Sequence, residues 1–197
     1  MADKQKADSF MVDPASSPTP PTPQNLTFFK VQHILRGLAV LFTAVSIAIL
    51  VTNHQTVTVF MMEFQAHFYY SSAFKFLVAA DAIVCASSVV TLILVVHLEK
   101  RKAIPQRRHY CFLLFLHDSV MMALMMGGCA AGTAIGYVGQ YGESHMGWGA
   151  TCDSVPKFCR LNVVSLLFSY LAFFAYFGLS LLSPVNFLSS SSFLPPN

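Results

Sequence analysis

The chain has 197 residues, of which 55% are hydrophobic and only 11% are charged. Soluble proteins carry roughly 25% charged residues, and so few charges cannot coat a globular surface of this size in water. The formal net charge is +3, but the basic residues gather at the ends of apolar stretches and form no aromatic-interleaved groove of the nucleic-acid-binding type. The composition therefore favours a protein of the lipid bilayer, with no nucleic-acid partner.

Residues 1–29 form a polar N-terminal segment, which we predict to be a disordered cytosolic tail. The segment lacks the apolar run of a cleaved signal peptide. Its stretch 16–23 contains only Ser, Thr and Pro, a composition typical of extended linkers. We interpret the tail as a soluble leader, with kinase recognition or docking to an SH3-type groove as alternatives.

Four apolar stretches, at residues 32–51, 74–96, 111–135 and 161–182, are long enough to cross a membrane, since a spanning helix needs about 20 residues. Helices satisfy every backbone group internally, as lipid requires, and no regular strand alternation competes. The sequence predicts an all-α membrane protein, a four-helix bundle over residues 30–182. Residues 183–197 are predicted to be a short cytosolic tail, with Pro184 ending the fourth helix.

The charges between the stretches indicate the orientation. Residues 99–108 contain five Lys or Arg and one acid, whereas residues 52–73 contain no Lys or Arg. Because basic loops stay on the cytosolic side, both chain ends are expected in the cytosol and residues 52–73 and 137–160 outside.

Arg36 and Asp118 lie at similar depths in the cytosolic halves of the first and third stretches. Pairing would offset the cost of placing an acid in lipid, so we predict a structural ion pair. Alternatively, Arg36 extends to the headgroups, and Asp118 is protonated or bonded to a neighbour.

Asp81 lies in the outer half of the second stretch, with no basic residue at its depth. An acid inside a membrane is a candidate functional residue. Its small neighbours, Ala79, Ala80 and Ala82, favour instead a hydrogen bond at a close helix contact.

Gly128, Gly132 and Gly136 recur every four residues in the third stretch, which places them on one smooth face. The face is expected to pack closely against another helix, either within the bundle or in a second chain.

Cys152 and Cys159 lie seven residues apart in the second outer loop. An oxidising compartment favours a disulfide between them. A zinc site that includes His145 is the alternative, although a fourth ligand is missing.

No catalytic or cofactor-binding arrangement is evident. His117 and Asp118 are adjacent, so on a helix they point about 100° apart and are not expected to form a catalytic base–orienter pair easily. Phosphate-binding, dinucleotide-binding and metalloprotease motifs are absent from the sequence. We therefore expect a protein that is not an enzyme and has no cofactor and no metal.

Several of these segments together resemble the plant Casparian strip membrane domain protein family. They are Arg36, the run 118–131, the run 70–80 and the loop containing Gly147, Trp148, Cys152 and Cys159. The resemblance covers roughly residues 30–182. In its first outer loop, residues 56–64, the chain departs from strip-forming members, which favours a CASP-like relative.

The resemblance implies a four-helix plasma-membrane protein, distantly similar to MARVEL tetraspan proteins. It implies homodimers and heterodimers with related members, membrane platforms and contact of the outer loops with cell-wall enzymes. We therefore expect a non-enzymatic scaffold. The alternative is a small channel or transporter subunit that uses Arg36, Asp81, His117 and Asp118. Such a pathway needs polar residues at matched depths, whereas Asp81 and Asp118 lie in opposite halves.

Overall fold

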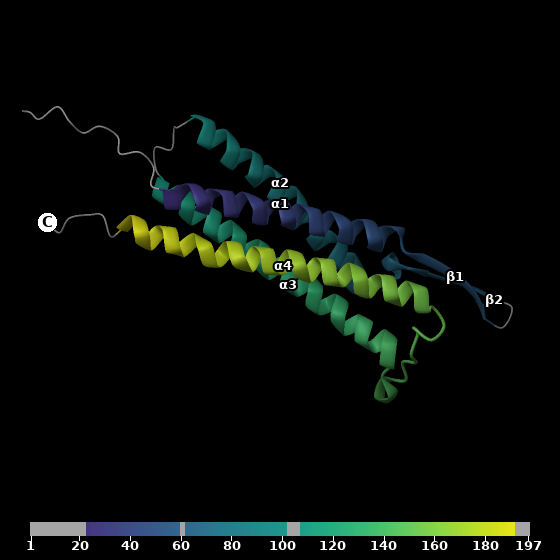
Figure 1. Ribbon diagram of the computed structural model, residues 1–197. Coiled ribbons are helices and arrows are strands. Elements are labelled where there is room, and N and C mark those ends of the chain that lie inside the picture. The colour runs from purple at the N-terminus through teal and green to yellow at the C-terminus, as the bar shows by residue number, and fades with distance from the viewer. Residues whose placement is uncertain (1–22, 60–61, 102–106, 192–197) are drawn as a thin grey trace, which may run out of the picture.

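The computed structural model describes residues 23–59, 62–101 and 107–191. Its main elements are four long helices, α1 (Pro23–Thr52), α2 (Ser72–Arg101), α3 (Arg107–Tyr141) and α4 (Pro156–Ser191), shown in Figure 1. Each helix contains a segment long and apolar enough to cross a membrane: Lys30–Thr52, Ser72–His97, Phe112–Tyr141 and Pro156–Leu182. The predicted fold, an all-α bundle of four transmembrane helices, is confirmed.

All four helices extend beyond the predicted spans, and two of them continue into the predicted tails. Helix α1 begins at Pro23, so residues 23–29 are helical although the sequence assigns them to the N-terminal tail. Helix α4 continues to Ser191, and the prediction that it ends at Pro184 is wrong. A proline removes one backbone hydrogen bond, which membrane helices tolerate. The remaining parts of both predicted tails, residues 1–22 and 192–197, lie outside the described residues.

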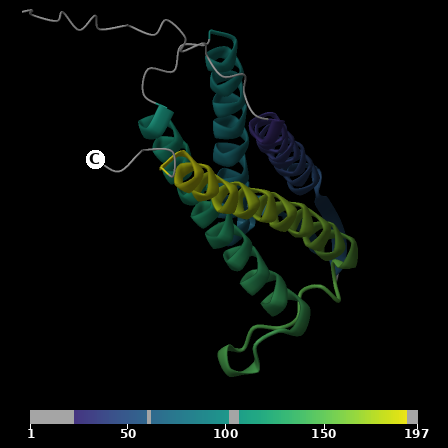
Figure 2. The same ribbon diagram turned by 60° about the vertical axis from the view of Figure 1, so that its left-hand side comes forward.

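The helices form a ring in chain order. Helix α1 packs against α2 and α4, and α3 packs against the same two neighbours. Helix α1 begins and α4 ends at one end of the bundle, called the terminal end here, and a β-hairpin projects from the opposite end, called the hairpin end (Figures 1 and 2). The ring brings all four helices around one interior.

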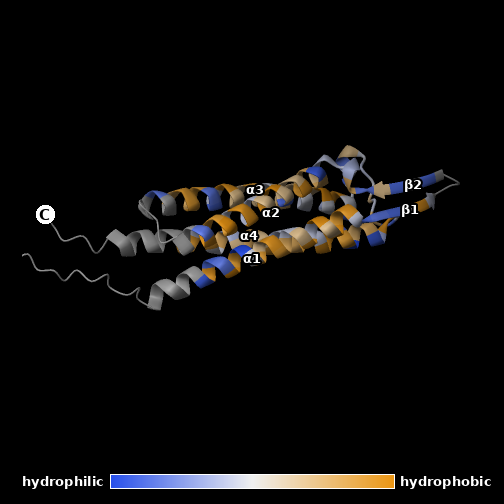
Figure 3. Cartoon of the chain, turned by 90° about the horizontal axis from the view of Figure 1, so that it is seen from above, coloured by the Kyte–Doolittle hydropathy of each residue, from blue (hydrophilic) through white to orange (hydrophobic). Residues whose placement is uncertain are grey.

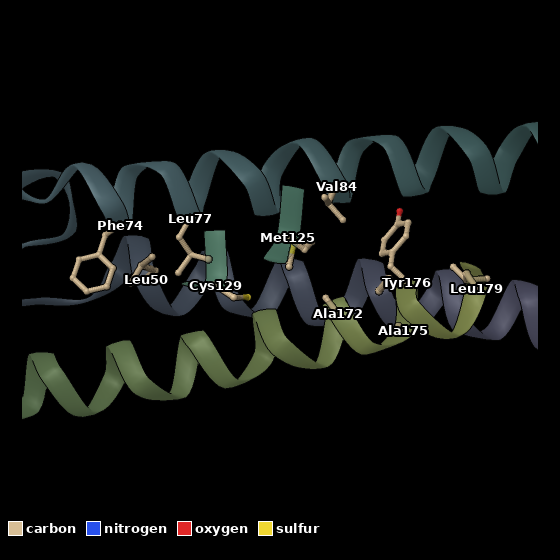
Figure 4. Packing of buried hydrophobic residues seen from close by; sticks show 11 residues of the cluster. Leu50, Phe74, Leu77, Val84, Met125, Cys129, Ala172, Ala175, Tyr176 and Leu179 are labelled. Atoms are coloured by element: carbon tan, nitrogen blue, oxygen red, sulfur yellow. The ribbon is translucent and has the colours of Figure 1, made fainter. Parts of the chain in front are cut away.

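The interior of the bundle is more polar than a soluble core. An apolar cluster that includes Leu77, Val84 and Met125 runs along it (Figure 4), but seven Ser, Thr and Asp side chains share this interior at 0% exposure: Thr43, Ser46, Asp81, Ser88, Asp118, Ser165 and Ser169. Large apolar side chains such as Ile34 and Phe174 are exposed instead, and apolar residues cover the helices along most of their length (Figure 3). A polar interior and an apolar surface are expected for helices in lipid, because hydrogen bonds between buried polar groups hold the helices together there.

The sequence analysis missed the hairpin. Strands β1 (His54–Val59) and β2 (Met62–His67) pair antiparallel, with Val59 opposite Met62, and a short 3₁₀ helix, η1 (Phe68–Tyr70), leads into α2. The run of alternating Thr and Val at residues 56–59 is a strand signal. The run is only four residues long, which makes it a weak signal beside the long apolar spans.

The connection between α3 and α4 is compact and contains a second 3₁₀ helix, η2 (Ser144–Met146). Glu143 and Trp148 exchange two backbone hydrogen bonds, of 2.7 and 3.0 Å. Gly142 has φ of +71°, and a Cβ there would lie 2.7 Å from the carbonyl oxygen of Trp148. Only glycine fits this turn without strain.

Candidate functional site

The first candidate site is a buried ion pair near the terminal end. Nη2 of Arg36 on α1 donates to both carboxylate oxygens of Asp118 on α3, at 2.9 and 2.7 Å. Nη1 of Arg36 donates to the Thr91 hydroxyl on α2 at 3.0 Å. Arg36 is 1% exposed and Asp118 is 0% exposed. The structure therefore brings together the two residues that the sequence paired, and Thr91 adds a contact that the sequence analysis did not name.

His117 lies at the edge of this pair. Its Nδ1 is 3.2 Å from a carboxylate oxygen of Asp118. The two neighbours were not expected to form a base–orienter pair easily, but the His117 ring reaches the carboxylate despite the different direction of its Cβ. His117 is 25% exposed and Asp118 faces the interior. We call Arg36, Thr91, His117 and Asp118 the ion-pair cluster.

Helix α4 makes a polar contact with α2 next to the ion-pair cluster. The hydroxyls of Tyr176 on α4 and Ser88 on α2 lie 2.5 Å apart, and Ser88 also donates to the carbonyl of Val84. Both side chains are 0% exposed. Polar contacts at this level therefore connect all four helices.

The second candidate site surrounds Asp81 on α2. One of its carboxylate oxygens, Oδ2, accepts hydrogen bonds from Ser46 on α1 at 2.7 Å and Ser169 on α4 at 2.8 Å. The Ser46 hydroxyl also lies 2.9 Å from that of Ser165. The other oxygen of Asp81, Oδ1, is buried without a hydrogen-bond partner. We call Ser46, Asp81, Ser165 and Ser169 the hydroxyl cluster, and it matches the favoured prediction of a hydrogen-bonded helix contact.

An apolar layer separates the two clusters. Val84 lies between Asp81 and Ser88 along α2, Met125 precedes Cys129 on α3, and Ala172 follows Ser169 on α4. These three side chains, Val84, Met125 and Ala172, are 0% exposed and lie in the same stretch of the interior (Figure 4). Thr43 of α1 lies in the same part of the chain's interior, and its hydroxyl donates to carbonyls of its own helix. The two polar clusters are therefore not continuous with each other.

The three glycines of the predicted stripe on α3, Gly128, Gly132 and Gly136, have different surroundings. A Cβ on Gly128 would lie 3.2 Å from the Cβ of Ala80, and one on Gly132 would lie 3.1 Å from Cδ1 of Leu166. Both glycines thus permit close packing inside the bundle. A Cβ on Gly136 would meet nothing within 4 Å, so the glycine stripe continues beyond the helix contact.

The predicted disulfide is present. Cys152 and Cys159 are joined, with a Cα–Cα distance of 5.7 Å, and the bond connects the α3–α4 loop to the first turns of α4. The zinc alternative is contradicted, because both thiols are consumed. Among the residues that the structure describes, no three His, Cys, Asp or Glu side chains gather as a metal site.

Two further residues, Asn53 and Gln55, fix the hairpin to α4 and were missed in the sequence. The amide of Asn53 donates to the Phe158 carbonyl at 2.8 Å and to the side chain of Asn162 at 2.9 Å. The Gln55 side chain accepts from the backbone amide of Phe158 at 2.8 Å. This amide is in the first turn of α4, where no helix carbonyl is available. No sequence motif marks this cap, because Gln55 and Phe158 are 103 residues apart in the chain. An ordinary capping residue directly precedes the helix that it caps.

An aromatic group surrounds the hairpin end. The rings of Tyr69 and Tyr70 lie 4.7 Å apart, and those of Tyr137 and Tyr141 lie 4.8 Å apart. A hydrogen bond with Tyr70 raises the pKa of Tyr69 above its ordinary value. Exposed Tyr and Trp at this level are typical of the boundary between lipid and water, and Trp148 is also exposed there.

Comparison with known proteins identifies the family of the chain. The sequence profile of the Casparian strip membrane protein domain matches residues 26–175. The chain belongs to the Casparian strip membrane protein family. The match spans the hairpin, the disulfide and both polar clusters, so these features lie within the family domain.

Members of the family with CASP-like names are similar over most of their length. CASP-like protein 1F2 of Ricinus communis is 48% identical over 176 residues, covering 89% of this chain and 86% of the relative. CASP-like protein 1F2 of Vitis vinifera is 42% identical over 165 residues, covering 84% and 85%. CASP-like protein 1F1 of Arabidopsis thaliana is 31% identical over 153 residues, covering 78% and 86%. No solved structure matches the chain significantly.

Proposed function

We propose that this CASP-like chain is a non-enzymatic scaffold of the plasma membrane that associates with itself and with related chains into platforms. The observation that carries the proposal is the use of its intramembrane polar groups. Arg36 and Asp118 bond to each other, and Asp81 bonds to serines of α1 and α4. These groups hold helices together, which is the chemistry of a structural bundle.

The alternative, a channel or transporter subunit, is less well supported by the geometry. A pathway for an ion needs polar groups or water along its length. Here Val84, Met125 and Ala172 lie between the ion-pair cluster and the hydroxyl cluster with 0% exposure. An ion that left one cluster would have to cross this apolar layer before it reached the other.

The orientation belongs to the same proposal. A cytosolic location of both chain ends is supported by the five basic residues at 99–108 and by the absence of Lys and Arg from residues 52–73. The hairpin and the disulfide loop then face the cell wall. Exposed aromatic residues at this end, among them Tyr70 and Trp148, offer a surface for cell-wall enzymes.

Fluorescence recovery after photobleaching in plant cells tests the scaffold. A fluorescent fusion of the full chain should recover much more slowly than an unrelated monomeric four-helix protein, and two differently tagged copies should co-precipitate. Fast recovery without co-precipitation would contradict the proposal. Ion flux through proteoliposomes that contain the purified chain would instead support the channel alternative.

Protease protection on sealed vesicles tests the orientation. With the cytosolic face outward, tags at both chain ends should be cleaved by added protease, and a site inserted next to Trp148 should be protected. The reverse pattern would contradict the assignment.

A further inference from the structure

A cavity of about 540 Å³ lies at the hairpin end, among α2, α3 and α4. Strand β2 and the disulfide loop contribute Gln65, His67 and Cys152 to its lining. Pockets for small ligands commonly have volumes of about 300–1,000 Å³. The cavity is therefore large enough for one ligand, and it belongs to neither polar cluster.

The cavity exists because α3 and α4 separate toward the hairpin end, as Figure 1 shows. The helices are still close at Gly132, where a Cβ would lie 3.1 Å from Leu166, and the hydroxyls of Thr133 and Tyr170 bridge them at 2.9 Å. One turn farther on, a Cβ on Gly136 would meet nothing within 4 Å. Gly136 thus leaves a smooth stretch of backbone facing open space.

The lining has an apolar part and a polar rim. Phe74, Ile135 and Leu166 come from the spanning segments and provide the apolar part, whereas Gln65, His67 and Gln140 lie where these segments end. Among the described residues that line the cavity, none is Lys, Arg, Asp or Glu. Along the membrane normal, the lining therefore changes from apolar side chains to hydrogen-bonding side chains, none of them an acid, a lysine or an arginine.

The cavity is accessible from the side of the bundle. Three of its lining residues, Thr133 and Tyr137 on α3 and Val163 on α4, are exposed, so the cavity opens at the surface between these two helices. In a bilayer this surface faces the lipid of the leaflet at the hairpin end. A ligand therefore enters from the membrane without crossing the protein.

We propose that this cavity binds a membrane sterol, a neutral lipid with a flat fused-ring body and a single hydroxyl. The ring system lies against the smooth backbone at Gly136, beside which the cavity is open, as helices do on glycine stripes. The hydroxyl meets the amide groups at the rim. A phospholipid fits less well, because its phosphate is bound by Lys or Arg, which the lining lacks.

The test uses the purified full chain in phosphatidylcholine nanodiscs that contain a photoreactive sterol. The wild-type chain should be labelled in the segments 132–140 and 159–166, and excess unlabelled sterol should compete. Gly136→Leu places a side chain in the cavity, and its Cβ would meet no atom within 4 Å. It should reduce labelling about tenfold, which corresponds to about 1.4 kcal/mol of binding free energy.

Ala134→Leu is the matched control, because Ala134 is exposed on the same helix and does not line the cavity. It should label like the wild-type chain. Val163→Trp narrows the cavity from α4 and should reproduce the effect of Gly136→Leu, even if the latter disturbs folding. Equal labelling of all chains would overturn the proposal. Preferential capture of a phosphatidylcholine with a photoreactive acyl chain over the sterol would also overturn it. The same holds if the site is protected from labelling only in a dimer of the chain.

Discussion

Asp118 and Asp81 are both completely buried in one helical bundle, but their environments differ. Asp118 receives two hydrogen bonds from the Arg36 guanidinium and a contact from His117. Asp81 has only serine hydroxyls around one oxygen, and its other oxygen has no partner. The two acids lie on either side of the apolar layer, toward opposite ends of the bundle.

The comparison shows two ways to place a carboxyl group inside a membrane. In a medium without water, a charge is costly unless an opposite charge lies next to it. At the terminal end Arg36 supplies that charge, so the integrity of the site depends on both partners. At the hairpin end Asp81 links α2 to α1 and α4 through hydroxyls, so its shape and accepting oxygen matter more than its charge.

The largest expected effect is that of Asp118→Ala. It leaves the Arg36 guanidinium buried without its counter-charge, and we expect a loss of about 3–5 kcal/mol in the free energy of unfolding. Arg36→Ala should cost a similar amount, and the double variant should cost less than the sum. Chemical unfolding in detergent measures these values, with Val120→Ala, an exposed position on the same helix, as the control. Strictly additive losses would show that the pair contributes no coupling energy.

A medium effect is expected from breaking the disulfide, which tests what else holds the hairpin end together. The Cys152→Ser, Cys159→Ser double variant opens a loop with a sequence separation of 7, worth about 2–3 kcal/mol by chain entropy. Asn53 and Gln55 still bind α4, so the bundle should still insert. Thiol labelling in intact cells and unfolding in detergent check the result. Labelling of both cysteines in the unreduced wild-type chain would contradict the bond, and failure of the variant to insert would show that the bond is needed for folding.

The smallest expected effect is that of Asp81→Asn, which sharpens the contrast with Asp118. The amide has nearly the same shape and keeps an oxygen that accepts from Ser46 and Ser169. We expect a change within about 1 kcal/mol, whereas Asp118→Asn in the same assay should cost several-fold more because Arg36 keeps its charge. Equal losses for the two substitutions would remove the distinction between the sites.

The sequence was sufficient for the spans and for the pairing of Arg36 with Asp118, because both follow from the cost of charge in lipid. It was also sufficient for the disulfide, since both cysteines lie in one short loop. These features depend on composition, depth or local spacing. Each of them can be read from one stretch of chain or from two positions at matched depth.

Contacts between distant segments could not be predicted in the same way. Asp81 meets Ser46 and Ser169 only because of the rotation of three helices about their axes, which the weak amphipathic pattern of membrane helices leaves open. The open space beside Gly136 depends on the angle between α3 and α4. A GxxxG pattern indicates a smooth face, but it does not say where the contact on that face stops.

The contacts of Asn53 and Gln55 with α4 also bear on the order in which the chain assembles during synthesis. The hairpin that carries Gln55 leaves the ribosome before Phe158, the residue whose backbone amide it accepts. Asn53 likewise waits for the Phe158 carbonyl and for Asn162. The first half of the chain therefore presents the side chains to which the first turns of α4 bind. Insertion of α4 completes these hydrogen bonds, and the Cys152–Cys159 bond ties the first turn of α4 to the loop before it.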